Sequence, residues 1–170
     1  MTLSHKAFSF DWRVFEDKLA GRLAAALAAT DPAPLLDFVR ANLAACKDPY
    51  EGHPLPSAWQ DLLEAGDVQE AADYSLTVCY QPARDLGLGE AWQAVSSSLP
   101  ELTRAALLGR PFGPPQALFD PGRQGSYFQT PQSVLQSIAA LEHQLHPALG
   151  TFRAALVAVA ERGNGLYVTF

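Results

Sequence analysis

The stretch of sequence that decides the fold is Gly163-Asn164-Gly165-Leu166-Tyr167-Val168-Thr169-Phe170. Its glycine and asparagine residues are typical of a tight turn, and the aliphatic, aromatic and β-branched residues that follow predict a strand at Leu166–Phe170. A lone strand of this length exposes unpaired backbone groups and is not stable by itself. We expect it to pair with an alternating stretch at Lys6–Phe10, with a short segment near residue 117 or 127, or with a second subunit.

Most of the remaining sequence shows helical patterns. Apolar residues recur every three or four positions over residues 12–29, Asp11 precedes them as a predicted N-cap, and Phe10 and Phe15 are placed as a hydrophobic staple. Further helices are predicted from Pro32 to Cys46, Ser57 to Gly66, Asp67 onward, Trp92 to Ser98, Ser98 to Gly109, Thr130 to Leu145 and Leu149 to Gly163.

Two segments carry mixed signals. Residues 67–80 fit a helix or a strand, and the capping box of Asp67 and Glu70 favours the helix. Residues 110–126 are rich in proline and glycine and are predicted to be irregular, with short strands at Ala117–Phe119 and Tyr127–Gln129. The 170 residues therefore predict a single domain, residues 1–170, of the α+β class. It is helix-dominated, with a small antiparallel or mixed sheet that includes the C-terminal strand.

Charge is distributed unevenly along the chain, whose net charge is −6. Residues 48–101 contain ten acidic residues and one basic residue, Arg84, whereas the segments before and after them carry small positive charges. An acidic stretch of this size repels phosphate, so nucleic acid is excluded as a partner. It attracts a basic protein instead.

Other features of the sequence bear on compartment. No run of apolar residues approaches the length of a membrane span, so we expect no membrane partner. The first residues do not form a signal peptide, which predicts a cytoplasmic protein. Cys46 and Cys79 lie in apolar helical patterns and are predicted to be reduced, structural thiols.

Motifs for catalysis, metals and cofactors are weak. His143 and His146 are spaced to share one helical face, but no third ligand accompanies them in a known zinc pattern, so no metal site is predicted. The cysteines lack an electropositive setting that would activate them. Gly87-Leu88-Gly89 begins like a dinucleotide-binding loop, but Trp92 occupies the place of the third glycine, so no cofactor is predicted. These observations favour a binding protein over an enzyme.

The loop Asp48-Pro49-Tyr50-Glu51-Gly52-His53 is the most suggestive local feature, because it groups carboxylates, a phenol and an imidazole on a proline-stiffened segment. Our first hypothesis is a non-catalytic immunity or inhibitor protein that binds a basic partner through an acidic surface. The residues proposed for that surface are Tyr50, Glu51, Asp61, Glu64, Asp67, Glu70 and Asp73. A plain alternative for the same residues is a solvated face that serves solubility.

A second hypothesis is a small-molecule-binding domain, or an unrecognised enzyme, with a pocket between residues 48–56 and 110–127. Its proposed lining residues are Tyr50, His53, Arg123 and Tyr127.

Several segments of the C-terminal half occur in a familiar order. They are Ala106-Leu107-Leu108-Gly109-Arg110-Pro111-Phe112-Gly113, then Gly125-Ser126-Tyr127-Phe128-Gln129-Thr130-Pro131-Gln132-Ser133-Val134, then Glu161-Arg162-Gly163-Asn164-Gly165-Leu166-Tyr167-Val168. This order resembles the YfbM-like family of small bacterial proteins of unknown function. The resemblance implies an α+β fold and no established activity. It implies a structural role for Tyr127, Thr130 and Pro131, at a strand end and a helix start.

Overall fold

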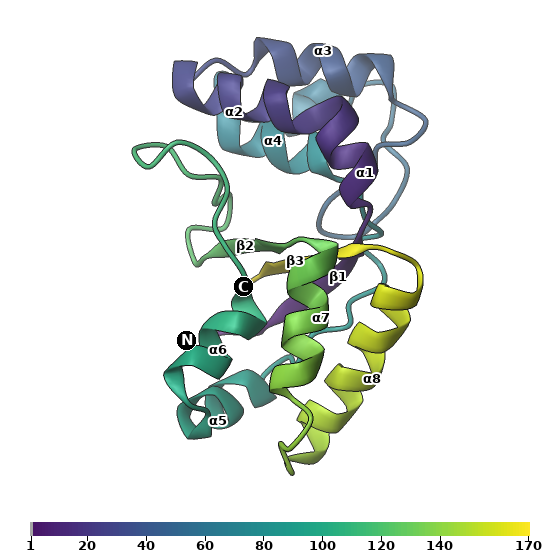
Figure 1. The fold of residues 1–170 in the computed structure, drawn as a ribbon. Coiled ribbons are helices and arrows are strands. Elements are labelled where there is room, and N and C mark those ends of the chain that lie inside the picture. The colour runs from purple at the N-terminus through teal and green to yellow at the C-terminus, as the bar shows by residue number, and fades with distance from the viewer. Residues whose placement is uncertain (1) are drawn as a thin grey trace.

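The computed structural model describes residues 2–170 and contains a three-stranded antiparallel sheet in the order β1-β3-β2 (Figure 1). The strands are β1 (Lys6–Phe10), β2 (Ser126–Gln129) and β3 (Gly165–Thr169). The predicted strand at the end of the chain is therefore the central strand, and it pairs with both the first strand and the segment near residue 127. The prediction of a helix-dominated α+β fold is confirmed.

The two faces of the sheet bury different side chains, because successive residues of a strand point to opposite sides. Phe8, Phe128 and Tyr167 face one hydrophobic cluster, whereas Leu166 and Val168 belong to another. In Figure 1 the first face is covered by α1 to α4 and the second by α5 to α8. Burial on both faces explains why β3 has no alternation of polar and apolar residues.

The first helical layer is built from the N-terminal half of the chain. Its elements are α1 (Trp12–Val14), the π-helical turn η1 (Phe15–Leu19), α2 (Ala20–Ala29), α3 (Ala33–Ala41), the short 3-10 helix η2 (Trp59–Leu62) and α4 (Val68–Leu76). The helical prediction for residues 12–29 is confirmed. The Asp11 carboxylate accepts a hydrogen bond from the backbone of Val14 at 3.0 Å, and the rings of Phe10 and Phe15 lie 5.2 Å apart.

Three boundaries in this layer differ from the prediction. Residues 42–45 form a turn, so α3 ends before Cys46. Ser57 caps no helix, since η2 is a single turn without a side-chain cap. Residues 67–80 are helical only as far as Leu76. Beyond it, the backbone N–H groups of Thr77, Val78 and Cys79 donate to carbonyls three residues back, which is the pattern of 3-10 turns.

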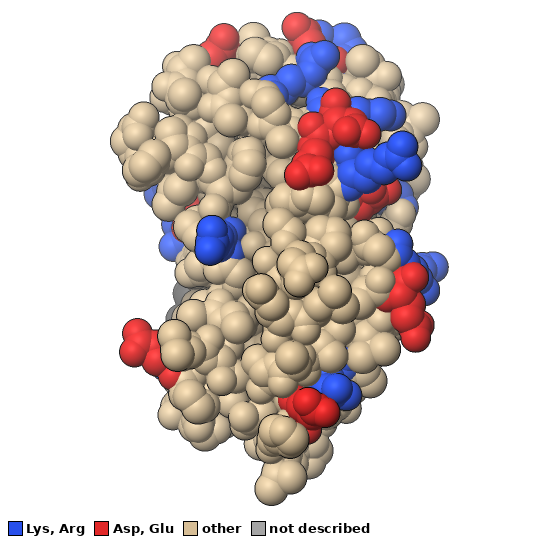
Figure 2. Space-filling model, in the orientation of Figure 1, with Lys and Arg blue, Asp and Glu red and all other residues tan. Residues whose placement is uncertain are grey.

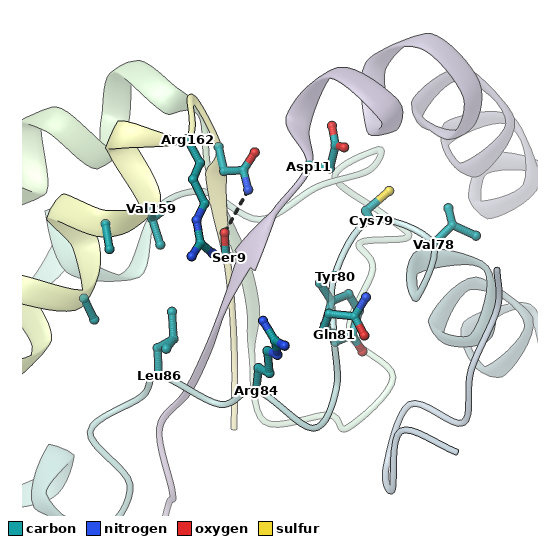
Figure 3. A pocket seen from close by; sticks show the side chains of 13 residues that line it. Ser9, Asp11, Val78, Cys79, Tyr80, Gln81, Arg84, Leu86, Val159 and Arg162 are labelled. Carbon is teal, nitrogen blue, oxygen red and sulfur yellow. Dashed lines mark hydrogen bonds between the residues drawn. The ribbon is translucent and has the colours of Figure 1, made fainter. Parts of the chain in front are cut away.

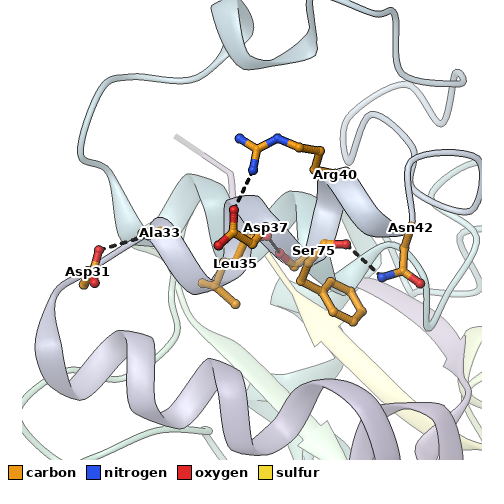
Figure 4. A network of polar contacts seen from close by, with 8 residues as sticks. Asp31, Ala33, Leu35, Asp37, Arg40, Asn42 and Ser75 are labelled. Carbon is orange, nitrogen blue, oxygen red and sulfur yellow. Dashed lines mark hydrogen bonds and ion pairs between the residues drawn. The ribbon is translucent and has the colours of Figure 1, made fainter.

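A buried hydroxyl joins α4 to α3. Ser75 Oγ lies 2.7 Å from the carbonyl of Ala71 in its own helix and 3.4 Å from that of Leu35 in α3 (Figure 4). The Asp37–Arg40 ion pair in Figure 4 lies on the exposed side of α3. This packing fixes the position of α4, which carries Asp73.

The second helical layer comprises α5 (Ala91–Ser98), α6 (Glu101–Leu108), α7 (Pro131–Ala140) and α8 (Pro147–Glu161). Thr130 caps α7 as predicted, because its hydroxyl accepts from the backbone of Ser133 at 3.1 Å. The predicted cap of α6 is wrong, since Pro100 occupies the N-cap position and Ser98 donates to the carbonyl of Val95 instead.

The link between α7 and α8 also departs from the prediction. α7 ends at Ala140, so Leu145 lies outside the helix and is 96 % exposed rather than packed. His143 lies in this link, and His146 caps α8 by accepting from the backbone of Ala148 at 3.2 Å. The two histidines therefore do not share a helical face.

Residues 110–125 cross the edge of β2 as an irregular segment. Arg110 forms a backbone bridge with Phe128, whereas the predicted strand at 117–119 is absent among the described residues. Phe119 instead donates from its backbone to Phe112, and its ring is fully buried beneath the segment. The path of this irregular segment brings Pro121 and Gly122 to the sheet, beside the loop that contains Tyr50.

Candidate functional site

A small cavity of about 160 Å³ lies where the loop at 47–56, α4, the irregular segment and the sheet meet. Asp73 of α4, Tyr50 of the loop, Tyr80 and the β3 residue Tyr167 line it, with Pro121 on the opposite side. We call it the Asp73 cavity. Its walls come from segments far apart in sequence, which the central position of β3 brings together.

Asp73 is the unusual residue of this cavity. Its side chain is only 7 % exposed, yet no residue within 2–170 donates a hydrogen bond to it or forms an ion pair with it. Burial, with a smaller contribution from Asp48 and Glu70, raises the pKa of Asp73 from 3.8 to about 7. A buried carboxylate without a donor costs folding free energy. The charged form of Asp73 therefore has no hydrogen-bond donor and no positive charge beside it, and a ligand can supply both.

Aromatic rings form the walls beside this carboxylate. The ring centroids of Tyr80 and Tyr167 are 5.2 Å apart, and that of Phe8 lies 4.9 Å from Tyr80. Burial, reinforced by the charge of Asp73, raises the pKa of both tyrosines well above the ordinary value, so their hydroxyl groups stay protonated. A carboxylate among aromatic rings is the environment that favours a bound cation.

Tyr50 stands at the rim, on a tightly turned loop. The Asp48 carboxylate accepts from the backbone of Tyr50 at 2.7 Å and of Glu51 at 2.9 Å, and Lys47 bridges to Pro54 across the base of the loop. These contacts fix the backbone at Tyr50, which is 69 % exposed. Tyr50 can therefore contact a partner and the cavity at once.

Acidic side chains gather around Tyr50. Burial and then the charges of Asp73, Glu70, Asp48 and Asp67, in that order, raise the pKa of its hydroxyl. We call Asp48, Asp67, Glu70 and Asp73, together with Tyr50, the acidic surface. None of these four acids forms an ion pair with a residue in the described part of the chain.

The other residues proposed for partner binding lie less centrally. The Glu70 carboxylate accepts from the backbone of Glu64, which places Glu64 beside the acidic surface. Asp61 lies in η2 and is exposed, and no contact connects it to Tyr50. Glu51 is exposed and pairs with His53 at 3.2 Å.

Of the four residues proposed for a pocket, the structure places only Tyr50 at the cavity. His53 is exposed and contacts the carboxylate of Glu51. Arg123 is exposed in a turn with φ of 56°. Tyr127 does not line this cavity, because it neighbours Phe128 in β2 and its ring packs on the other face of the sheet. Tyr80 and Tyr167 carry no signal of a site in the sequence, because both lie in apolar runs that indicate core packing.

The face of the molecule shown in Figure 2 carries charges of both signs. On the face shown in Figure 2, acidic and basic side chains lie next to one another over the layer of α1 to α4, while the surface over α7 carries almost no charge. Two ion pairs of this layer, Arg13–Asp17 and Asp37–Arg40, are exposed. The acidic surface differs from this mixed arrangement because its carboxylates have no basic partner within residues 2–170.

Little in the structure supports a cysteine nucleophile or a metal site. Burial raises the pKa of Cys46 to about 11 and that of Cys79 to about 12, so both thiols stay protonated and are poor nucleophiles. No group of three potential metal ligands occurs within residues 2–170. In the same part of the chain, no helix combines the length and the apolar character needed to cross a membrane.

Comparison of the chain with models of known protein families, with curated proteins and with solved structures finds no match. The resemblance of the C-terminal half to the YfbM-like family remains a prediction. The function must therefore be inferred from the site itself.

Proposed function

We propose that this protein is a non-catalytic binding protein, of the immunity or inhibitor type, that takes up a lysine or arginine side chain of a basic protein partner in the Asp73 cavity. The acidic surface attracts the partner, and Tyr50 packs against it at the rim. The observation that carries the proposal is Asp73, a residue only 7 % exposed whose carboxylate lines a cavity and has no donor within residues 2–170.

The energetics favour a cation in this position. An ammonium or guanidinium group gives Asp73 the charge partner that it lacks, and such charge-assisted hydrogen bonds are about twice as strong as neutral ones. Contact with the rings of Tyr80 and Tyr167 adds about 0.5–2 kcal/mol of cation–π attraction. Lys6 also lines the cavity, but it is exposed and forms no ion pair with any described acid.

The size of the cavity distinguishes a protein partner from a free small molecule. Pockets for drug-sized ligands usually measure about 300–1,000 Å³, whereas the Asp73 cavity measures about 160 Å³. That space suits one cationic head group, and a useful affinity then requires contacts outside the cavity. The exposed ring of Tyr50 and the carboxylates of Glu70 and Asp67 supply such contacts for a protein surface.

The proposal is tested with defined cationic probes. A short lysine-containing peptide, the same peptide with an acetylated lysine, and free butylammonium are titrated into the protein and followed by calorimetry and amide NMR. We expect the lysine peptide to bind and the acetylated peptide to bind at least about tenfold more weakly, since acetylation removes the charge. Butylammonium binding as tightly as the peptide would favour the small-molecule alternative.

Paired variants locate the binding. Asp73→Asn is expected to weaken the lysine peptide at least about tenfold. Asp61→Asn removes one charge of the same sign from an exposed position and is expected to change binding little. Equal binding by the wild type and Asp73→Asn would overturn the proposal.

A further inference from the structure

The outer edge of β1 is covered by hydrogen bonds except at one residue. His5 exchanges two backbone hydrogen bonds with Gly89, at 3.0 and 2.9 Å. Ala7 donates to the Asp85 carboxylate at 3.0 Å and accepts from Leu86 at 2.7 Å, and Asp11 donates to the carbonyl of Cys79 at 2.8 Å. Ser9 lies between these positions.

The backbone N–H and C=O of Ser9 point to the same outer edge of β1. In an antiparallel pair, alternate residues direct their N–H and C=O groups to opposite sides of the strand. His5 and Ala7 point away from β3, so Ser9 points the same way, and neither its N–H nor its C=O has a partner within residues 2–170. Only its hydroxyl is engaged, accepting from Asn164 at 2.9 Å.

A cleft of about 430 Å³ opens over this backbone (Figure 3). Ser9 lies on its floor, α8 forms one wall and residues 78–86 form the other. Leu86, Val78 and Val159 make much of the lining apolar. The cleft thus combines an unpaired strand edge with space for a ligand beside it.

Two arginines reach into this cleft from opposite walls. Figure 3 shows the side chains of Arg84 and Arg162 extending toward the space beside Ser9. Neither forms an ion pair or a side-chain hydrogen bond with a residue of the described chain, whereas Arg13 and Arg40 are both paired. The Asp11 carboxylate also lines the cleft, but it already accepts from the backbone of Val14 at 3.0 Å.

We propose that this cleft binds the carboxyl end of a peptide. One residue of an extended peptide presents its own N–H and C=O to the same side, and these pair with the free C=O and N–H of Ser9 as in β-strand addition. The terminal carboxylate lies between Arg84 and Arg162, whose planar guanidinium groups suit a carboxylate. The volume accommodates about two or three residues. This site is separate from the Asp73 cavity, although Tyr80 lines both.

The probe is a mixture of tripeptides with free carboxylates, randomised at all positions and compared with the same mixture made as carboxamides. Binding is followed by the amide NMR signal of Ser9 and by fluorescence polarisation of labelled members. We expect the free acids to shift the Ser9 signal and the carboxamides to bind at least about tenfold more weakly. N-methylation of the penultimate residue of the tripeptide is expected to weaken binding similarly, because it removes the N–H that pairs with the Ser9 carbonyl.

Protein variants separate this site from the first. Arg84→Gln and Arg162→Gln are each expected to weaken the free acids at least about tenfold, whereas Arg123→Gln, an exposed arginine elsewhere, serves as the matched control. For members that have no lysine, no arginine and a blocked amino terminus, Asp73→Asn is expected to leave binding unchanged. Equal binding of acids and carboxamides, or no movement of the Ser9 signal at millimolar peptide, would refute the proposal.

Discussion

Two buried ionisable side chains, Asp73 and His5, make the stability of the protein depend on pH in opposite directions. Burial lowers the pKa of His5 from 6.5 to about 4, while the nearby Asp85 offsets part of this effect. The neutral ring accepts from the backbone of Leu88 through Nδ1 at 3.0 Å and stacks on Trp92 at 4.8 Å, while its Nε2 has no partner within residues 2–170. Because its folded pKa is lowered, His5 destabilises the protein as the pH falls through 6.5 toward 4.

Asp73 has the reverse effect on the pH dependence of stability, because its pKa is raised in the folded protein. The folded protein holds this proton more tightly, so stability is lost as the pH rises from 3.8 through about 7. We expect Asp73→Asn to be more stable than the wild type above neutral pH, by about 2 to 4 kcal/mol. The advantage shrinks as the pH falls. Denaturant titrations over a series of pH values measure it, and the contribution of His5 cancels in the difference between the two proteins.

The matched control for this experiment is Asp61→Asn, whose side chain is exposed and for which we expect no such pH dependence. A difference between wild type and Asp73→Asn that stays constant across the pH series would show that Asp73 is not a strained carboxylate. A variant that is more stable and yet binds the lysine peptide less well would have the signature of a residue kept for binding.

At the scale of single elements, a buried amide ties β2 to two helices. Gln129 is fully buried, donates to the carbonyl of Leu107 in α6 at 2.7 Å and accepts from the Ser137 hydroxyl of α7 at 2.7 Å. The same hydroxyl lies 2.9 Å from the carbonyl of Ala106, so its single hydrogen serves two acceptors. These contacts set the position of α6 and α7 on the sheet.

Ser137→Ala removes that donor and leaves the amide oxygen of Gln129 buried without one. We expect the free energy of unfolding to fall by about 1–3 kcal/mol, with no change in the lysine-peptide affinity because the Asp73 cavity lies on the other face of the sheet. Thermal and denaturant unfolding measure the loss. Ser97→Ala, at an exposed position of α5, is the control and should cost less than about 0.5 kcal/mol.

A helix boundary can be predicted when the contact that sets it joins residues close together in sequence. Asp11 and Thr130 were recognised because each caps the residue three positions onward, which is a contact within one turn. Ser57 and Ser98 have the same local pattern but do not cap, since Ala58 and Pro100 occupy the N-cap positions and the Ser98 hydroxyl donates to the carbonyl of Val95. A short pattern thus predicts a helix boundary only where no neighbouring residue or competing hydrogen bond displaces it.

At the scale of the whole molecule, the candidate site was less predictable than the fold. The acidic character of residues 48–101 and the mixed polar chemistry of the loop that contains Tyr50 are visible in sequence. The cavity was not, because Asp73, Tyr80 and Tyr167 converge only when β3 is placed between the two layers. No spacing rule connects residues on α4, the following turn and the last strand, whereas helices and strands depend on spacing alone.

The central position of β3 also has a consequence for unfolding. Tyr167 packs in the cluster under α1 to α4, while Leu166 and Val168 pack in the cluster under α5 to α8. One strand thus contributes to both cores, and neither core is complete without it. We therefore expect residues 1–170 to unfold as one cooperative unit, as the sequence predicts for a single domain.

Tryptophan positions make this expectation measurable. The chain has three tryptophans; Trp59 lies in a cluster beside α3 and α4, and Trp92 lies in the opposite layer. After incorporation of 5-fluorotryptophan, ¹⁹F NMR follows each site during denaturant unfolding, with Trp→Phe variants for assignment. We expect Leu156→Ala, a buried truncation in α8, to lower stability by about 2–5 kcal/mol and to shift the transitions of Trp59 and Trp92 equally. If Trp59 keeps its native signal after Trp92 has lost its own, the two layers unfold independently and the single-domain prediction is wrong.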